Sequence, residues 1–377
     1  MSSPRIRASL SGIPTYKPGR KPAAAGDRPT YKLSSNETPF PPLLELTEAI
    51  QRAASGVNRY PDTTSARLAE RLSDRFAVPM TDVAVGTGSV SLIYHLVQAI
   101  CEPGDEVIYA WRSFEAYPIA TQVGSATSVQ VPLTSDARHD LDAMAGAVTE
   151  RTRMILVCTP NNPTGPVVSQ RELVALADRV GEDVLIVVDE AYLQFVVPNE
   201  QDPVADGLAL YRERPNICVL RTFSKAYGLA NLRVGFAIAA EPVAQALRTC
   251  VLPFPVSTVA EEAAIAALDL EDKLFARVAE VITERQRVRS ALLDLGWPIP
   301  ESEANFVWFP LDDRADEFAA ACEEQGVVVR PFGGPGPTVG GCRVTIGEPE
   351  ANDIVIRVAA QFPPPPQPHP AGNPGPQ

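Results

Sequence analysis

The chain contains the stretch Val184-Leu185-Ile186-Val187-Val188-Asp189-Glu190-Ala191-Tyr192. Its first five residues form the most apolar run of the sequence, and a strand that is buried on both faces has this composition. An aspartate follows the run directly. Because a carboxylate at the end of a buried strand must be paired, we expect Asp189 to face a cationic partner.

Other short apolar segments alternate with helical patterns on both sides of this stretch. Helical spacing of apolar residues separates them, as in 170–180. The alternation predicts an α/β fold, a mostly parallel sheet with helices on both faces. The expected strands of this sheet are Asp82–Gly86, Glu106–Tyr109, Arg153–Cys158, Val184–Val188, Ile217–Arg221 and Val234–Ala239.

The pattern changes after Pro255. A charged helical stretch covers about 257–295, with a break near Leu270, and it leads into a segment that we interpret as a smaller α+β domain. The expected elements of that domain are strands at Phe306–Phe309, Val327–Arg330 and Arg343–Ile346 and a closing helix at Glu350–Gln361. The last 15 residues contain 8 prolines, which predicts a solvated tail outside any core.

Composition excludes several classes of protein. The 377 residues carry a formal net charge of −13, which disfavours nucleic acid and anionic membranes as partners. No apolar run approaches membrane-spanning length, and the N-terminus has no apolar core of a secretory signal. Six scattered cysteines indicate reduced thiols in a cytoplasmic protein. Because the chain has only three histidines, we expect neither a zinc site nor a histidine-based catalytic triad.

Polar clusters follow four of the expected strands. In a parallel sheet ligands bind beyond the carboxyl ends of the strands, so these clusters should converge on one edge. Each alone is a common turn or helix cap, but together they suit one ligand. The clusters are Gly86-Thr87-Gly88-Ser89, Asn161-Asn162-Pro163-Thr164-Gly165, Asp189-Glu190-Ala191-Tyr192 and Thr222-Phe223-Ser224-Lys225.

The first and last clusters offer a phosphate site and a nucleophile. A helix that begins near Ser89 presents free backbone N–H groups, to which Ser224 and Arg233 add a hydroxyl and a guanidinium. Lys225 is an amine whose pKa should fall near other cations, which suits attack on an aldehyde.

The middle clusters offer partners for a ring. Asp189 suits a protonated ring nitrogen, and Asn162 and Tyr192 suit a ring oxygen. A phosphate, a ring nitrogen, a ring oxygen and an aldehyde together describe pyridoxal 5'-phosphate.

Three ordered motifs resemble those of the fold-type-I aminotransferases. They are Asn161–Gly165, Asp189–Tyr192 and Ser224-Lys225-Ala226-Tyr227-Gly228-Leu229-Ala230-Asn231-Leu232-Arg233-Val234-Gly235. Within that family the chain resembles the histidinol-phosphate aminotransferase branch over about residues 10–362. The supporting motifs are Leu33–Pro39, Arg59–Asp62, Cys101–Asp105 and Ala304–Phe306.

The resemblance implies the pyridoxal 5'-phosphate-dependent transferase fold, with an arm and part of the small domain at 1–38, a large cofactor-binding domain at 39–270, a small domain at 271–362 and a disordered tail at 363–377. It implies a homodimer in which Tyr60 reaches the phosphate of the neighbouring subunit. Lys225 resembles the lysine that binds the cofactor covalently and moves the proton. The implied cofactor contacts are Ser89, Val90, Phe114, Asn162, Asp189, Tyr192, Ser224 and Arg233, and the implied substrate contacts are Arg343, Asn36, Tyr16 and Phe254.

Two departures from the branch favour an aromatic amino acid over histidinol phosphate. In the branch, hydroxyl-bearing tyrosines occupy the places of Phe114 and Phe254, and a phosphate needs such donors. The segment Ser113–Tyr117 also resembles actinobacterial phenylalanine aminotransferases. We therefore expect transfer of the amino group of phenylalanine or tyrosine to 2-oxoglutarate, with histidinol-phosphate aminotransferase as the alternative.

Other interpretations remain open at this level. Asn36 either caps a turn or contacts substrate, and Tyr16 either packs the arm or contacts substrate. Arg330 is either a second anion-binding group or part of a surface ion pair, of which we favour the ion pair. Glu190 is expected in a structural hydrogen bond. His95 and His139 are taken as ordinary helix or loop residues. A non-enzymatic regulator, a decarboxylase and a carbon–sulfur lyase share the same scaffold, although an intact lysine and carboxylate-binding arginine favour an enzyme.

Overall fold

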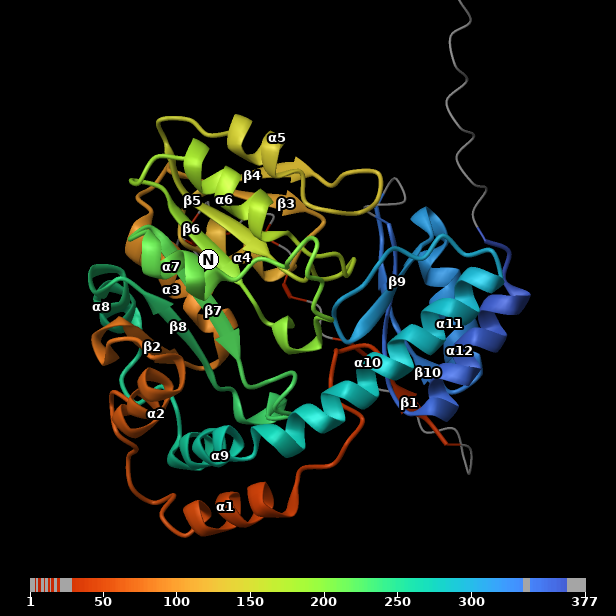
Figure 1. Cartoon of the computed structure of the whole chain (residues 1–377), viewed down its shortest axis with the longest axis horizontal. Coiled ribbons are helices and arrows are strands. Elements are labelled where there is room, and N and C mark those ends of the chain that lie inside the picture. The colour runs from red at the N-terminus through yellow and green to blue at the C-terminus, as the bar shows by residue number, and fades with distance from the viewer. Residues whose placement is uncertain are drawn as a thin grey trace, which may run out of the picture.

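A seven-stranded sheet forms the centre of the larger part of the molecule, as the computed structural model shows (Figure 1). Its strand order is β2-β8-β7-β6-β5-β3-β4. The strands from β4 to β7 are parallel, and β8 runs antiparallel to both of its neighbours. The strands are β2 (Val83–Gly86), β3 (Glu106–Trp111), β4 (Thr127–Pro132), β5 (Thr152–Cys158), β6 (Leu185–Asp189), β7 (Ile217–Thr222) and β8 (Gly235–Ala239).

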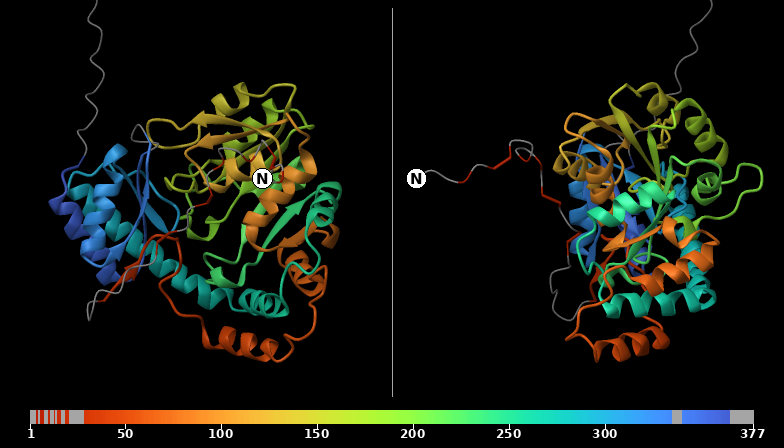
Figure 2. Two further views of the ribbon diagram at one scale, coloured as in Figure 1. Left: turned by 180° about the vertical axis from the view of Figure 1, so that it is seen from behind. Right: turned by 90° about the vertical axis from the view of Figure 1, so that its left-hand side faces the viewer.

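Helices cover both faces of this sheet (Figures 1 and 2). Side chains alternate along each strand, so Ile186 and Val188 of β6 enter one apolar cluster, and Leu185 and Val187 enter the other. The first cluster includes residues of α2 (Ala66–Phe76), α5 (Leu141–Gly146), α6 (Gln170–Arg179) and α7 (Gly207–Glu213). The second includes residues of α3 (Gly88–Ile100), α4 (Ala116–Val123) and α8 (Glu241–Cys250).

A smaller part of the molecule contains the antiparallel sheet β11-β12-β9. Its helices lie on one side of this sheet, and the other side faces the larger part (Figure 1). A two-residue parallel pairing of β1 (Tyr31–Lys32) with β10 (Val327–Val328) attaches the N-terminal segment here. The elements are β9 (Phe306–Pro310), β11 (Arg330–Phe332), β12 (Gly341–Thr345), α11 (Ala315–Glu324) and α12 (Pro349–Gln361).

Two consecutive helices connect the parts. They are α9 (Thr258–Asp269) and α10 (Glu271–Asp294), which meet at Leu270, the predicted break. The second of them extends from the larger part to the smaller one (Figure 1), while α1 (Leu44–Ala54) lies alongside α9. The domain boundary predicted at residue 270 stays a prediction.

The structure agrees with the predicted α/β class and its smaller α+β part. Sequence patterns missed β4 and β1. Strand β4 is an edge strand with mostly exposed side chains, and β1 has two residues, so neither carries a buried alternation. The described residues are 29–334, 340–364 and residues 4, 6, 7, 10, 13, 15, 16, 19 and 20. The predicted tail therefore lies outside the description, except for Pro363 and Pro364. No described helix is both long and apolar enough to cross a membrane.

The predicted structural role of Glu190 is confirmed. This fully buried carboxylate accepts hydrogen bonds from Arg221 Nε at 2.7 Å and from the backbone N–H of Gly207 at 2.8 Å. Burial raises the pKa of Glu190, and the Arg221 guanidinium opposes that rise.

We expect Arg221→Met to lower the free energy of unfolding by about 3–5 kcal/mol, because it leaves a buried charge unpaired. Urea denaturation measures the change. Arg71→Met, at the exposed pair with Asp269, is the matched control and should cost at most about 1 kcal/mol. Equal effects of the two substitutions would contradict this interpretation of the buried pair.

Candidate active site

A cavity of about 470 Å³ lies beyond the carboxyl ends of β5, β6 and β7, where the two parts of the molecule meet. Its lining comes from both parts and from the segment that follows β1. The predicted site residues in this lining are Tyr16, Asn36, Ser89, Val90, Phe114, Asn162, Asp189, Tyr192, Ser224, Lys225, Arg233 and Arg343. Two others, Tyr60 and Phe254, do not line it.

One corner of the cavity is built to hold an anion. Helix α3 begins at Gly88, so the backbone N–H groups of its first turn and the positive end of its dipole face this corner. Arg233 Nη1 donates to Ser224 Oγ at 3.2 Å and to Ala230 O at 2.8 Å, which fixes the guanidinium beside the helix. A phosphate group fits this combination of donors.

Two glycines make the corner possible. Gly88 has a φ of +78°, and a Cβ there would stand 2.6 Å from Arg233 Nη2. A Cβ on Gly235 would stand 2.3 Å from the backbone nitrogen of Ser89. The absence of side chains therefore lets β8 and the Arg233 guanidinium approach the start of α3.

Asp189 ends β6 in the floor of the cavity. The side chain is buried, and its Oδ2 accepts a hydrogen bond from Tyr117 Oη at 2.8 Å. Its Oδ1 has no partner among the described residues. Burial raises the pKa of Asp189 to about 6, although the Tyr117 hydroxyl opposes the shift. An orphaned carboxylate oxygen facing a cavity fits a protonated ring nitrogen, so the residues present fit pyridoxal 5'-phosphate.

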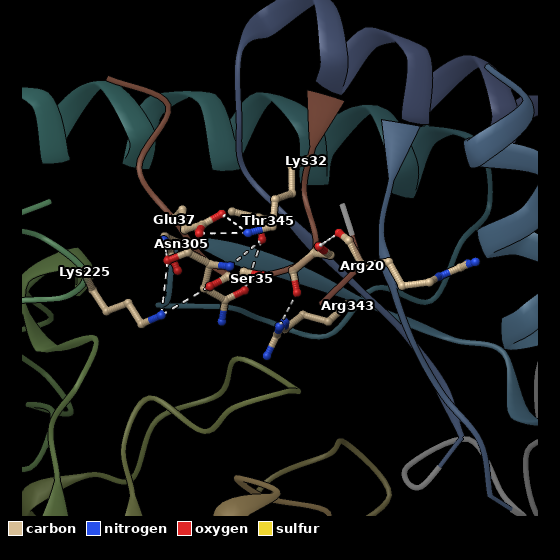
Figure 3. A network of polar contacts seen from close by, with 10 residues as sticks. Arg20, Lys32, Ser35, Glu37, Lys225, Asn305, Arg343 and Thr345 are labelled. Carbon is tan, nitrogen blue, oxygen red and sulfur yellow. Dashed lines mark hydrogen bonds and ion pairs between the residues drawn. The ribbon is translucent and has the colours of Figure 1, made fainter. Parts of the chain in front are cut away.

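The Lys225 amine enters the cavity from the loop after β7. Its Nζ donates to the backbone oxygens of Ser35 and Asn36, at 3.3 Å each (Figure 3). Burial lowers the pKa of this amine to about 7. The positive charge of Arg343 contributes to the shift, and the negative charge of Glu37 opposes it. A substantial fraction of Lys225 is therefore a neutral nucleophile at neutral pH.

Two polar side chains lie between the lysine and the small sheet. Tyr192 Oη accepts a hydrogen bond from Asn36 Nδ2 at 2.8 Å, and the Tyr192 ring centroid lies 5.8 Å from Lys225 Nζ. The Tyr192 hydroxyl remains available as a donor to a cofactor oxygen. Asn36 also bonds to Thr345 of β12, so it contacts both parts of the molecule.

Arg343 projects from β12 into the same cavity. Its Nη1 donates to Asn162 Oδ1 at 2.5 Å, and its Nη2 donates to Ser34 O at 2.9 Å. Its buried Nε has no partner among the described residues. The guanidinium lies 5.5 Å from the ring centroids of Phe306 and Phe332, an apolar setting that strengthens its attraction for a carboxylate.

Sequence reasoning missed Tyr117 and misjudged Arg330. Tyr117 is the second residue of α4 and is fully buried. The one sequence feature that could have identified it as a site residue is its position three residues after Phe114. Arg330 forms the expected ion pair, with Glu115 at 2.8 Å, but its side chain is 12% exposed and lines the cavity, so the expected surface position is wrong. The pair is part-buried and joins β11 to the residue before α4. His95 lies on α3 and His139 in a loop, as predicted.

Tyr60 and Phe254 occupy a different place. Their rings stack with centroids 4.5 Å apart, and 82% of Tyr60 and 39% of Phe254 are exposed. In one chain the two aromatic residues therefore form part of the surface, and their predicted contacts stay predictions.

Comparison with known proteins agrees with this geometry. Residues 28–358 match the family described as aminotransferase class I and II. Aromatic amino acid aminotransferases of Streptomyces avermitilis and Streptomyces coelicolor are 59% and 60% identical to this chain, over 96% of it and 98% of each relative. Histidinol-phosphate aminotransferase of Sinorhizobium meliloti, solved with pyridoxal 5'-phosphate, superposes with a TM-score of 0.84 at 25% identity, over 96% of this chain and 98% of that one.

The fold and the cavity define a pyridoxal 5'-phosphate-dependent protein of fold type I. The chain belongs to the class I and II aminotransferase family.

The low pKa of Lys225 predicts how the apoenzyme takes up its cofactor. The rate of covalent attachment should rise about tenfold per pH unit below 7 and level off above it, because the neutral amine is the nucleophile. Stopped-flow absorbance between pH 5.5 and 9 measures this, with N-acetyl-lysine methylamide correcting for titration of the cofactor. Arg343→Met should move the midpoint upward. A wild-type midpoint above 9 would contradict the prediction.

Proposed function

We propose that this enzyme transfers the amino group of an aromatic amino acid to 2-oxoglutarate. The observation that carries the proposal is the full-length identity of 59–60% to two proteins named aromatic amino acid aminotransferases. The cavity supports it, because it holds an amine, a buried carboxylate and a buried guanidinium together.

The cofactor supplies an aldehyde and an electron-accepting ring when it is bound. We assign its phosphate to the anion corner: the N–H groups of Ser89 and Val90, the Ser224 hydroxyl and the Arg233 guanidinium. The assignment follows from the donors gathered there.

The ring is assigned to the remaining groups of the floor. Asp189 would hold the proton on the ring nitrogen, since its Oδ1 has no hydrogen-bond partner among the described residues. Asn162 and Tyr192 would bind the ring oxygen, and Phe114, which lines the same cavity, would contact the ring.

Lys225 and Arg343 act on the substrate. Arg343 binds the carboxylate of the amino acid through its guanidinium, and the unpartnered Nε is the donor available for this bond. Lys225, as a neutral amine, accepts the proton from the substrate Cα and returns it in the reverse half of the reaction. Asn36 and Tyr16 line the same space and complete the substrate contacts.

Histidinol phosphate is the second candidate substrate. The structural similarity to the Sinorhizobium meliloti enzyme favours it, because the two share their overall fold. Fold alone does not determine substrate, however, and Phe114 places an apolar edge in the cavity where a phosphate would need a hydroxyl.

Half-reactions test the proposal directly. Phenylalanine should convert the cofactor absorbance of the holoenzyme to that of its amino form, with kcat/KM at least tenfold above that for histidinol phosphate. Turnover should stop without 2-oxoglutarate, and Lys225→Ala should abolish it. A preference for histidinol phosphate would overturn the aromatic assignment, and product formation without a keto acid would indicate a lyase.

We further propose a cytoplasmic homodimer with shared active sites. The free cysteines are consistent with a reducing compartment. The stacked Tyr60 and Phe254 form an exposed aromatic pair, and Leu252 nearby is 73% exposed. Exposed aromatic groups of this kind mark interfaces between protein chains. Tyr60 then reaches the phosphate of the partner's site, and Phe254 lies beside that site.

Sedimentation of the holoenzyme should give twice the chain mass of 40.5 kDa at micromolar concentration. Tyr60→Phe should preserve the dimer and weaken cofactor binding about tenfold, because it removes one hydrogen bond to a charged group. Equilibrium dialysis against the cofactor measures the loss. A monomer in sedimentation, or unchanged affinity in the variant, would contradict the shared site.

A further inference from the structure

Three consecutive backbone oxygens accept hydrogen bonds from two cations of the cavity, Lys225 and Arg343 (Figure 3). They belong to residues 34–36, which we call the carbonyl strap. Ser34 O accepts from Arg343 Nη2, and the oxygens of Ser35 and Asn36 accept from Lys225 Nζ. Within the described chain, the hydrogen-bond acceptors of the Lys225 amine are thus two neutral carbonyl groups.

Asn36 is held in place on every side. Its backbone N–H donates to Thr345 Oγ1 at 2.9 Å, and its Oδ1 accepts from the same hydroxyl at 3.1 Å. Its Nδ2 donates to Tyr192, and its backbone oxygen also accepts from Asn305 Nδ2 at 3.1 Å. The residue has a φ of +53°, a conformation that persists because these contacts fix it.

The side chain of Asn305 lies in a buried position that an apolar residue of the same size would suit better. It is 2% exposed, and its Oδ1 has no partner in the described chain. A half-satisfied buried amide is costly compared with an apolar residue of the same size. Its bond to the Asn36 carbonyl is therefore the feature that distinguishes it from a core leucine.

A neutral amine has two N–H groups and one lone pair. When both N–H groups donate to carbonyl oxygens, the lone pair is left to accept a proton, which is what a general base requires. We propose that the carbonyl strap holds the Lys225 amine whenever it is not bonded to the cofactor, and that Asn305 is a positioning residue that fixes the Asn36 carbonyl for this purpose. The catalytic part of this inference rests on the proposed function.

The charged groups that act on the Lys225 amine are Arg343, Glu37, Arg233, Lys32 and Asp189. Substitution of Asn305 changes none of them. A change in the titration of Lys225 in such a variant therefore reports on the strap.

The test compares Asn305→Leu with wild type and with Asn216→Leu. Asn216 is a matched control, because it is a buried asparagine that donates to a backbone oxygen, Val184 O at 3.0 Å, outside the cavity. Carbamoylation of Lys225 by cyanate in the apoenzyme, followed by mass spectrometry across pH, gives the titration midpoint. Single-turnover rates with phenylalanine and α-deuterated phenylalanine give the proton-transfer step.

Loss of the fixed carbonyl removes an acceptor that stabilises the ammonium form, so the midpoint in Asn305→Leu should fall by at least 0.5 pH unit, on the order of 0.7 kcal/mol. Proton transfer should slow at least fivefold with a larger isotope effect, and the affinity for phenylalanine should change less than twofold. Asn216→Leu should match wild type in both measurements.

A midpoint and an isotope effect equal to wild type in Asn305→Leu would overturn the inference. Thr345→Val, which preserves side-chain volume and removes two bonds to Asn36, gives the same test if Asn305→Leu does not fold. A wild-type enzyme that does not convert phenylalanine would contradict the proposed function, while the cyanate titration would still decide whether the strap holds the amine.

Discussion

Asp189 places a carboxylate at the buried end of β6, where one oxygen bonds to Tyr117 and the other has no partner in the described chain. Taking a charge out of water costs several kcal/mol unless a partner compensates it, which explains the elevated pKa of the side chain. A cationic ring nitrogen removes that cost. The anion corner at the start of α3 and the amine of Lys225 lie around the same cavity, so a molecule that pairs with Asp189 also meets a phosphate site and a nucleophile.

Two of the cations that line the cavity share one backbone segment. Arg343 and Lys225 both donate to the carbonyl strap, although one comes from β12 and the other from the loop after β7. The strap follows β1, which pairs with β10 in the smaller part, and Asn36 bonds to Tyr192 of the larger part. With the roles proposed for Arg343 and Lys225, substrate binding and proton transfer would depend on the same three residues, whose side chains alone give no indication of this arrangement.

Substrate choice is separate from the fold. A histidinol-phosphate aminotransferase shares this architecture at 25% identity. The aromatic amino acid aminotransferases at 59–60% identity are expected to share it as well. The distinction must lie in side chains at the cavity edge and on the surface. Phe114 is inside the cavity, whereas Phe254 stacks on Tyr60 outside it. In a single chain, then, one of the two sequence departures lines the cavity and the other lies on the surface.

The sequence by itself determined the parallel sheet and the cluster of Asp189, Lys225 and the start of α3, because apolar runs that end in polar residues must place those residues at one edge of a sheet. It could not locate Tyr117 opposite Asp189, the part-buried Arg330–Glu115 pair or the approach of residues 34–36 to Lys225. These contacts join segments 72 to 215 residues apart. No local periodicity encodes them. The Tyr117–Asp189 contact depends on how α4 packs on the central sheet, and the other two depend on how the smaller part and the segment after β1 pack against the larger part.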